Sequence, residues 1–97
     1  MKYTVLIQEV ASKRIKELFL KILYDYKDPI NASNYIDGLI EAIYSLEILP
    51  NRCALVKNGI YSDNVLSYRY LLYKNSKIVF RVEEDRVIVV DVAFAGE

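Results

Sequence analysis

The sequence predicts an α+β fold, in which an N-terminal strand and an α-helical hairpin precede a three-stranded antiparallel meander in one sheet (β-α-α-β-β-β). Apolar side chains in residues 15–26 recur at i, i+3, i+4 and i+7, which is the period of a helix. Residues 3–7 and 66–94 are instead rich in β-branched and aromatic side chains, which is typical of strands. A chain of 97 residues that is 54% apolar is long enough for one core, so we expect a single domain over residues 1–97.

The helical hairpin is predicted between residues 10 and 49. The first helix is expected from about residue 10 to 26, with its apolar stripe formed by Ile15, Leu18, Phe19, Ile22, Leu23 and Tyr26. Asp28 and Pro29 are typical of a helix start, because Asp accepts from the free amides of the first turn and Pro is tolerated there. The second helix should end near residues 47–49, since Pro50 cannot continue it. Gly38 within it indicates a close approach of the first helix.

The strands are predicted on both sides of this hairpin. Residues 3–7 form the first strand, at a sheet edge or beside the last strand. Residues 50–65 are a long connection, with a short extended piece at residues 54–57 and a turn at Asn58-Gly59. A β-hairpin follows at residues 66–82, and then a last strand at residues 87–94. Its continuous apolar run predicts a strand that is covered on both faces.

Each arm of the β-hairpin carries one arginine, Arg69 or Arg81, among apolar neighbours. Side chains alternate between the two faces of a strand, so the turn length decides whether these arginines share a face. A two-residue turn at residues 75–76 separates them, whereas a three-residue connection at residues 75–77 places them on one face. A two-residue turn at residues 84–85 would then bring four apolar side chains to the face of Arg81: Ile88, Val90, Val92 and Phe94.

The residues that are missing limit the chemistry. The chain has no histidine and a single cysteine, Cys53, which excludes the Ser-His-Asp and Cys-His triads and histidine metal sites. We expect no metal and no cofactor, and any catalysis would use Lys, Arg, Tyr or carboxylates. One cysteine fits a reducing compartment, and the N-terminal apolar run is too short for a signal peptide or a membrane span. The expected location is cytoplasmic, away from the membrane.

Basic residues gather in the middle of the chain. Residues 52–81 carry six basic and one acidic side chain, and residues 82–97 carry one basic and five acidic. A local basic patch can bind phosphate or an acidic partner. Arg69 and Arg81 are the main candidates for such a site. Lys57 and Tyr61 are weaker candidates, because functional side chains are frequent in long connections like residues 50–65.

The order and spacing of several short motifs resemble the RelE/ParE superfamily of bacterial toxins. They are Asp28-Pro29-Ile30-Asn31-Ala32, Ile43-x-x-Leu46-Glu47-x-x-Pro50, Tyr68-Arg69-x-Leu71-Leu72-Tyr73-Lys74-Asn75, and the run from Ile78 to Val87. The resemblance covers nearly the whole chain. It implies the toxin half of a type II toxin–antitoxin module, which inhibits growth when free and is neutralised by a cognate antitoxin.

The resemblance implies two classes of target. RelE-like members cleave mRNA on the ribosome, and ParE-like members poison DNA gyrase. For the RNA-cleaving branch, Arg69 and Arg81 match motif arginines that would bind the scissile phosphate and stabilise the transition state. The usual His or Tyr near the end of the last strand falls at Phe94, which cannot transfer a proton. We therefore expect a ParE-like or other target, with an RNA-cleaving toxin and an inactive binding protein of the same fold as alternatives.

Overall fold

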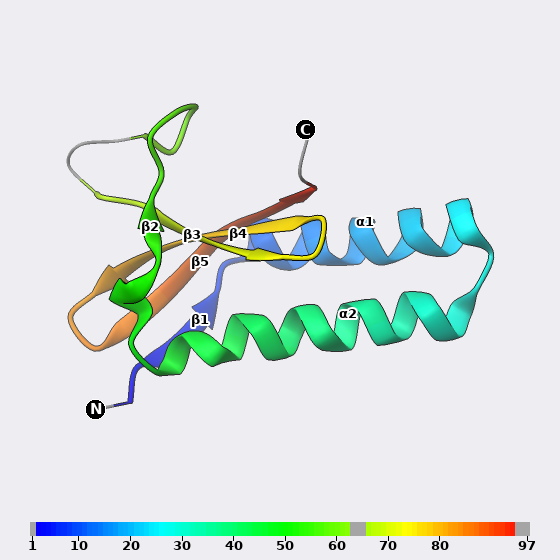
Figure 1. Cartoon of the computed structure of the whole chain (residues 1–97), viewed down its shortest axis with the longest axis horizontal. Coiled ribbons are helices and arrows are strands. Elements are labelled where there is room, and N and C mark those ends of the chain that lie inside the picture. The colour runs from blue at the N-terminus through cyan, green and yellow to red at the C-terminus, as the bar shows by residue number, and fades with distance from the viewer. Residues whose placement is uncertain (1, 63–65, 95–97) are drawn as a thin grey trace.

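The computed structural model describes residues 2–62 and 66–94, and its element order agrees with the predicted α+β class (Figure 1). The elements are β1 (Thr4–Ile7), α1 (Glu9–Tyr26), α2 (Pro29–Tyr44), β2 (Ala54–Leu55), β3 (Arg69–Tyr73), β4 (Ser76–Glu83) and β5 (Arg86–Phe94), with short 3₁₀ helices at Ser45–Glu47 and Pro50–Arg52. α1 and the meander lie where the sequence predicts them, and α2 begins where expected but ends at Tyr44, with the 3₁₀ helix Ser45–Glu47 after it. The additional strand is β2, where a short extended piece was expected.

The strands form one five-stranded sheet in the order β1-β5-β4-β3-β2. β1 pairs with β5 in parallel, and all other neighbours are antiparallel. The prediction that the first strand lies at an edge or beside the last strand is therefore confirmed on both counts. β5 lies between β1 and β4, as its apolar sequence indicated.

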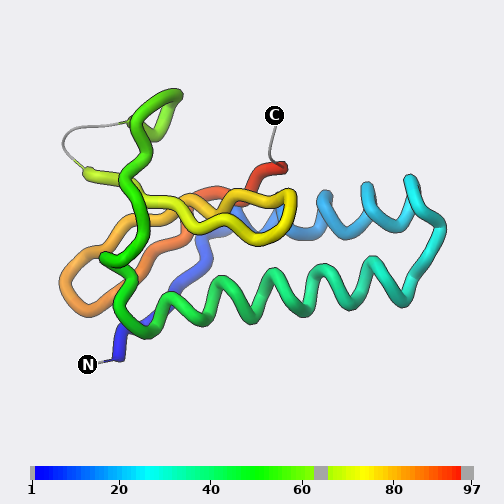
Figure 2. The backbone as a smooth tube through the Cα atoms, viewed as in Figure 1, coloured from blue at the N-terminus to red at the C-terminus, as the bar shows by residue number. Residues whose placement is uncertain are grey.

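The two helices pack as an antiparallel pair against one face of the sheet, which we call the helix-side face. Asp28 begins α2 as expected, because its carboxylate accepts a hydrogen bond from the Asn31 amide at 3.1 Å. The tip of the helical hairpin extends past the β3–β4 turn (Figure 2). Tyr26 lies at this tip and is 75% exposed, so its predicted place in the buried stripe is wrong. The stripe is buried only where the sheet lies beneath it.

The main core lies between the helices and the helix-side face. Its largest fully buried side chains come from α2, the following 3₁₀ helix, β4 and β5: Phe80, Leu39, Ile43, Leu46, Ile78, Val87 and Val89. Burial of one such side chain contributes about 1.5–3 kcal/mol, so this layer supplies most of the favourable free energy of folding.

Gly38 allows α2 to approach the sheet. A Cβ at this position would overlap the hydroxyl group of Tyr73 on β3. The close approach predicted for Gly38 is thus made by a sheet tyrosine, and the expected neighbour, α1, is the wrong one. Tyr73 also packs edge-on against Tyr35, with ring centroids 5.4 Å apart. These contacts fix α2 over the end of the β3–β4 hairpin.

The β3–β4 turn differs from both registers that the sequence suggested. Tyr73 pairs with Ser76, so the turn consists of Lys74 and Asn75. Lys74 has a φ of 49°, and Ser76 is fully buried with its hydroxyl 2.6 Å from the Tyr35 hydroxyl. Serine is frequent in turns, but the buried hydrogen bond of Ser76 holds this residue in β4.

A β-bulge divides β5 into two parts. Val79 pairs with Asp91 and Phe80 pairs with Val89, so Val90 is the extra residue. Ile88 and Val90 therefore lie on the outer face of the sheet, whereas Val92 and Phe94 join the helix-side core. The prediction that these four side chains share a face is wrong, because the bulge shifts the alternation by one residue.

The outer face of the sheet is covered by side chains that lie outside the helices and strands. Val79, Ile88 and Val90 form a small cluster there, and Val56, Tyr61 and Tyr68 pack on it. The β1 side of β5 is also only partly covered. β1 ends at Ile7, opposite Val89, and the Arg14 side chain from α1 then donates to the Val92 carbonyl oxygen at 3.1 Å.

Candidate functional site

Arg69 and Arg81 lie on opposite faces of the sheet. Arg69 pairs with Phe80, which belongs to the helix-side core. Arg81 pairs with Ile88, which belongs to the outer cluster, as the predicted turn at residues 84–85 required. The two guanidinium groups therefore do not line one cleft. The first turn has two residues, and an even length separates the arginines.

Arg69 is used to hold the edge of the sheet. Its Nη1 donates to the carbonyl oxygen of Cys53 at 2.6 Å, just before β2 begins. Cys53 is buried, and burial raises the pKa of its thiol, although Arg52 and Arg69 oppose that shift. The thiol is therefore neutral near pH 7, and a neutral thiol is a poor nucleophile. The contact between Arg69 and Cys53 is therefore structural.

Arg81 is paired with an acidic side chain on its own strand. Its Nε donates to Glu83 at 3.1 Å, and the Arg81 side chain is only 18% exposed. Glu83 also lies 3.8 Å from Arg86 across the next turn. A phosphate at Arg81 would have to compete with this carboxylate, which weakens the site that the sequence suggested.

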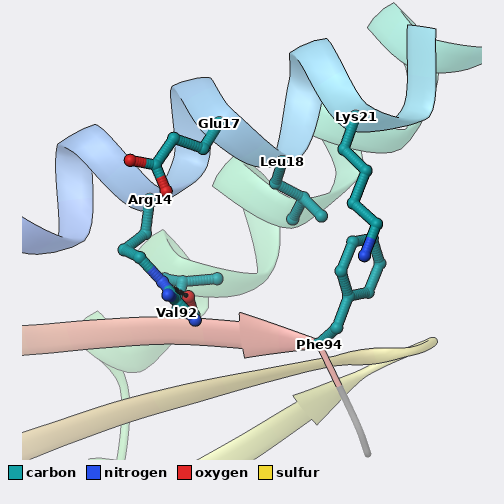
Figure 3. Close-up of a pocket in the computed structure, with 6 residues that line it drawn as sticks. All are labelled: Arg14, Glu17, Leu18, Lys21, Val92 and Phe94. Carbon is teal, nitrogen blue, oxygen red and sulfur yellow. Dashed lines mark hydrogen bonds between the residues drawn. The ribbon is translucent and has the colours of Figure 1, made fainter. Parts of the chain in front are cut away.

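Phe94 points toward α1, on the helix side of the sheet (Figure 3). The Lys21 ammonium lies 4.8 Å from the centroid of its ring. A small cavity of about 100 Å³ lies here, lined by Arg14, Glu17, Leu18, Lys21, Val92 and Phe94. The predicted grouping of two arginines with an aromatic side chain at the strand end is not formed.

Tyr61 lies on the outer face, with its hydroxyl near the carboxylate of Asp91. Burial raises the pKa of its hydroxyl, and the neighbouring Asp91 charge raises this pKa further. Arg14 Nε lies 3.6 Å from the same carboxylate, and the Arg14 charge opposes this rise in the pKa of Tyr61. A tyrosine with a raised pKa is almost fully protonated near pH 7, so Tyr61 is poorly suited to act as a general base.

Lys57 lies in the same groove as Lys77, which was not among the candidates predicted from the sequence. Lys57 and Lys77 line the same groove of about 330 Å³, between the segment that follows β2 and the β3–β4 hairpin. The Lys77 ammonium lies 4.7 Å from the centroid of the Tyr70 ring. One predicted register placed Lys77 in the turn and the other paired it with Lys74, whereas the observed register places it on β4 opposite Leu72.

Two other features are absent from the described ranges, residues 2–62 and 66–94. No three His, Cys, Asp or Glu side chains there come together as a metal site would require. No helix among these residues has the length and apolar character needed to cross a bilayer.

Comparison with known proteins gives structural neighbours and no sequence relatives. The sequence matches no protein-family model and no curated protein. Its structure is similar to a chain of the chromosomal ParDE TA system from P. aeruginosa, with a TM-score of 0.78, 14% identity and 96% of each chain covered. It is also similar to a chain of the toxin–antitoxin complex RelBE2 from Mycobacterium tuberculosis, with a TM-score of 0.69, 13% identity and 97% and 99% of the two chains covered.

The chain has a RelE/ParE-like fold. The coverage is nearly complete in both directions, so the helical hairpin and the sheet both belong to this fold. At 13–14% identity the likeness concerns the fold, and the chemistry must be argued from the side chains of this chain. In this chain, strand pairing places Arg69 and Arg81 on opposite faces of the sheet.

Proposed function

We propose that this protein is the toxin component of a type II toxin–antitoxin module, with a ParE-like or other non-ribonucleolytic target such as DNA gyrase. It would inhibit growth when free and would be neutralised by a cognate antitoxin. The observation that carries this proposal is the likeness, over 96% of both chains, to a chain of a ParDE TA system.

The positions of the candidate catalytic residues favour this proposal over RNA cleavage. Cleavage by 2′-OH attack needs a base, an acid and cations around one phosphate. Arg69 and Arg81 lie on opposite faces, and Phe94 is the aromatic side chain at the strand end. These positions do not bring a base, an acid and cations together around one phosphodiester. A toxin that acts by binding its target does not need such a group of side chains.

The test is controlled expression of the chain in a bacterium, with and without the product of any small reading frame found next to its gene. We expect growth arrest on induction, recovery on coexpression, and inhibition of purified gyrase in a supercoiling assay. Unchanged growth with a folded protein present at high level would contradict the toxin role.

The same cultures separate the two targets. Cuts in mRNA that depend on translation and are lost in Arg81→Ala would favour the ribonuclease alternative. Intact transcripts together with DNA breaks would favour a gyrase target. A folded Lys16→Gln variant serves as the control for expression level, because Lys16 lies on the exposed side of α1.

A further inference from the structure

The groove that contains Lys57 and Lys77 carries positive charge without an acidic side chain to balance it. Lys57, Asn58, Tyr70 and Lys77 line it, together with three apolar side chains from β2 and β3. In the part of the chain that the structure describes, neither lysine forms an ion pair. Both ammonium groups therefore have hydrogen-bond donors free for a ligand.

The position of Lys77 is restrained by an aromatic ring. Its ammonium lies 4.7 Å from the centroid of the Tyr70 ring, and the two residues come from neighbouring strands, β4 and β3. A cation over a ring is attracted by the ring quadrupole. This contact leaves the ammonium at the groove with a restricted set of positions, which lowers the entropy cost of holding an anion.

The rest of the groove is suited to an organic group. Leu72 is 61% exposed and Leu55 is 44% exposed, and both line the groove. Asn58 adds an amide that can donate and accept hydrogen bonds. The groove therefore combines two point charges with an apolar wall and one polar group. A free inorganic anion would leave the apolar wall unused.

We propose that this groove binds a phosphate monoester whose organic part has a flat apolar face and a polar edge, as the base of a nucleoside 5′-monophosphate does. A monoester carries close to two negative charges near pH 7, whereas a phosphodiester carries one. Two lysines without a carboxylate match the doubly charged group. The ligand would be a free nucleotide or the 5′-phosphorylated end of a strand, since both present the same chemistry.

The test is a titration of the whole ¹⁵N-labelled chain, followed by amide chemical shifts at constant ionic strength. The probes are adenosine 5′-monophosphate, its 3′,5′-cyclic diester and adenosine. We expect saturable shifts at residues 54–58 and 70–77 with the monoester, binding of the diester at least about fivefold weaker, and no saturation with adenosine. Equal affinity for the monoester and the diester, or shifts spread over lysines elsewhere, would overturn the proposal.

Three variants locate the site. Lys57→Gln and Lys77→Gln should each weaken monoester binding about tenfold, because each removes one charge-assisted hydrogen bond. Lys16→Gln makes the same change of charge on the exposed side of α1, and its affinity should stay within twofold. Affinities that are the same in all three variants would show that the net charge of the chain, and not the groove, attracts the ligand.

A 5′-phosphorylated trinucleotide and the same trinucleotide without the phosphate distinguish the sources of the ligand. Tighter binding of the phosphorylated strand than of the free nucleotide identifies a strand end. Equal or tighter binding of the free nucleotide identifies a small-molecule ligand. Equal binding of the two trinucleotides would contradict the proposal, because the second contains only diesters. Growth arrest plays no part in these measurements, so the toxin role and the groove can fail separately.

Discussion

The two faces of the sheet are covered in different ways. The helix-side face lies under two helices and contains the fully buried side chains Phe80, Ile78, Val87 and Val89. Among the described residues, the outer face has a cluster of three buried residues, Val79, Ile88 and Val90, with Val56, Tyr61 and Tyr68 packed on it. The helix-side face therefore contributes most of the stability of the fold. The other face is held by few contacts, and it carries the lysine groove.

Of the substitutions that compare the two faces, truncation of Phe80 should lower the free energy of unfolding the most. Phe80→Ala opens a cavity in the helix-side core and is expected to lower the free energy of unfolding by about 3–5 kcal/mol. Val79→Ala, one residue earlier and on the outer face, should cost roughly 1–2 kcal/mol. Chemical denaturation of both variants is the measurement. Similar losses would mean that the outer cluster is as important for stability as the core.

Gly38→Ala should be the next largest change. The added methyl overlaps the Tyr73 hydroxyl, and such overpacking typically costs about 1–3 kcal/mol despite the better helix propensity of Ala. In a Tyr73→Leu background the overlap is removed. The same substitution should then be neutral or stabilising, by up to about 1 kcal/mol. A double-mutant cycle measures this coupling, and a penalty that persists in the Leu background would rule out the steric explanation.

Tyr61→Phe tests how the outer face is held. Loss of the hydroxyl beside Asp91 should cost about 1 kcal/mol and speed amide exchange in residues 56–62. The pKa of Tyr61 is raised in the folded state above its ordinary value of 10.0. Its contribution to stability is therefore present below pH 10 and is lost as pH rises through the higher folded pKa.

The variant should thus show a shallower loss of stability than the wild type above pH 10. Thermal unfolding between pH 8 and 11 provides the comparison, and parallel curves for the two proteins would show that Tyr61 titrates with its ordinary pKa.

Lys21→Gln should have the smallest effect. It removes the ammonium over the Phe94 ring and should cost about 0.5–1 kcal/mol, because the pair lies at the surface. Lys13→Gln, also exposed on α1, is the matched control. A larger loss than this from Lys21→Gln would mean that the end of β5 depends on α1 more strongly than its half-buried Phe94 suggests.

The sequence predicted the elements well, and its errors concern the pairing of side chains. Helix periodicity, the Asp28-Pro29 start and the apolar strands are local signals, and each appears where expected. The position of Ser76 depends on a hydrogen bond to Tyr35, 41 residues away, which no local pattern contains. The extra residue Val90 is equally invisible, since a bulge in an all-apolar strand leaves the composition unchanged.

These two local features account for the errors at the candidate site. The register set by Ser76 places Arg69 on the helix-side face, and the bulge at Val90 turns Phe94 toward α1. Lys57 was proposed from its position in a long connection, and the structure adds Lys77 beside it. The residue types in a sequence can indicate which cations belong to a site. Strand pairing decides which of those cations lie together on one face of the sheet.

The contact between Arg14 and β5 has a consequence for the behaviour of the protein in concentrated solution. β1 ends opposite Val89 while β5 continues to Phe94, and such an unpaired strand edge can template pairing with a second molecule. Arg14 occupies this edge through the Val92 carbonyl, and brings a bulky charged group to the position that a foreign strand would take. Arg14 thus disfavours pairing of a second strand along this stretch of β5.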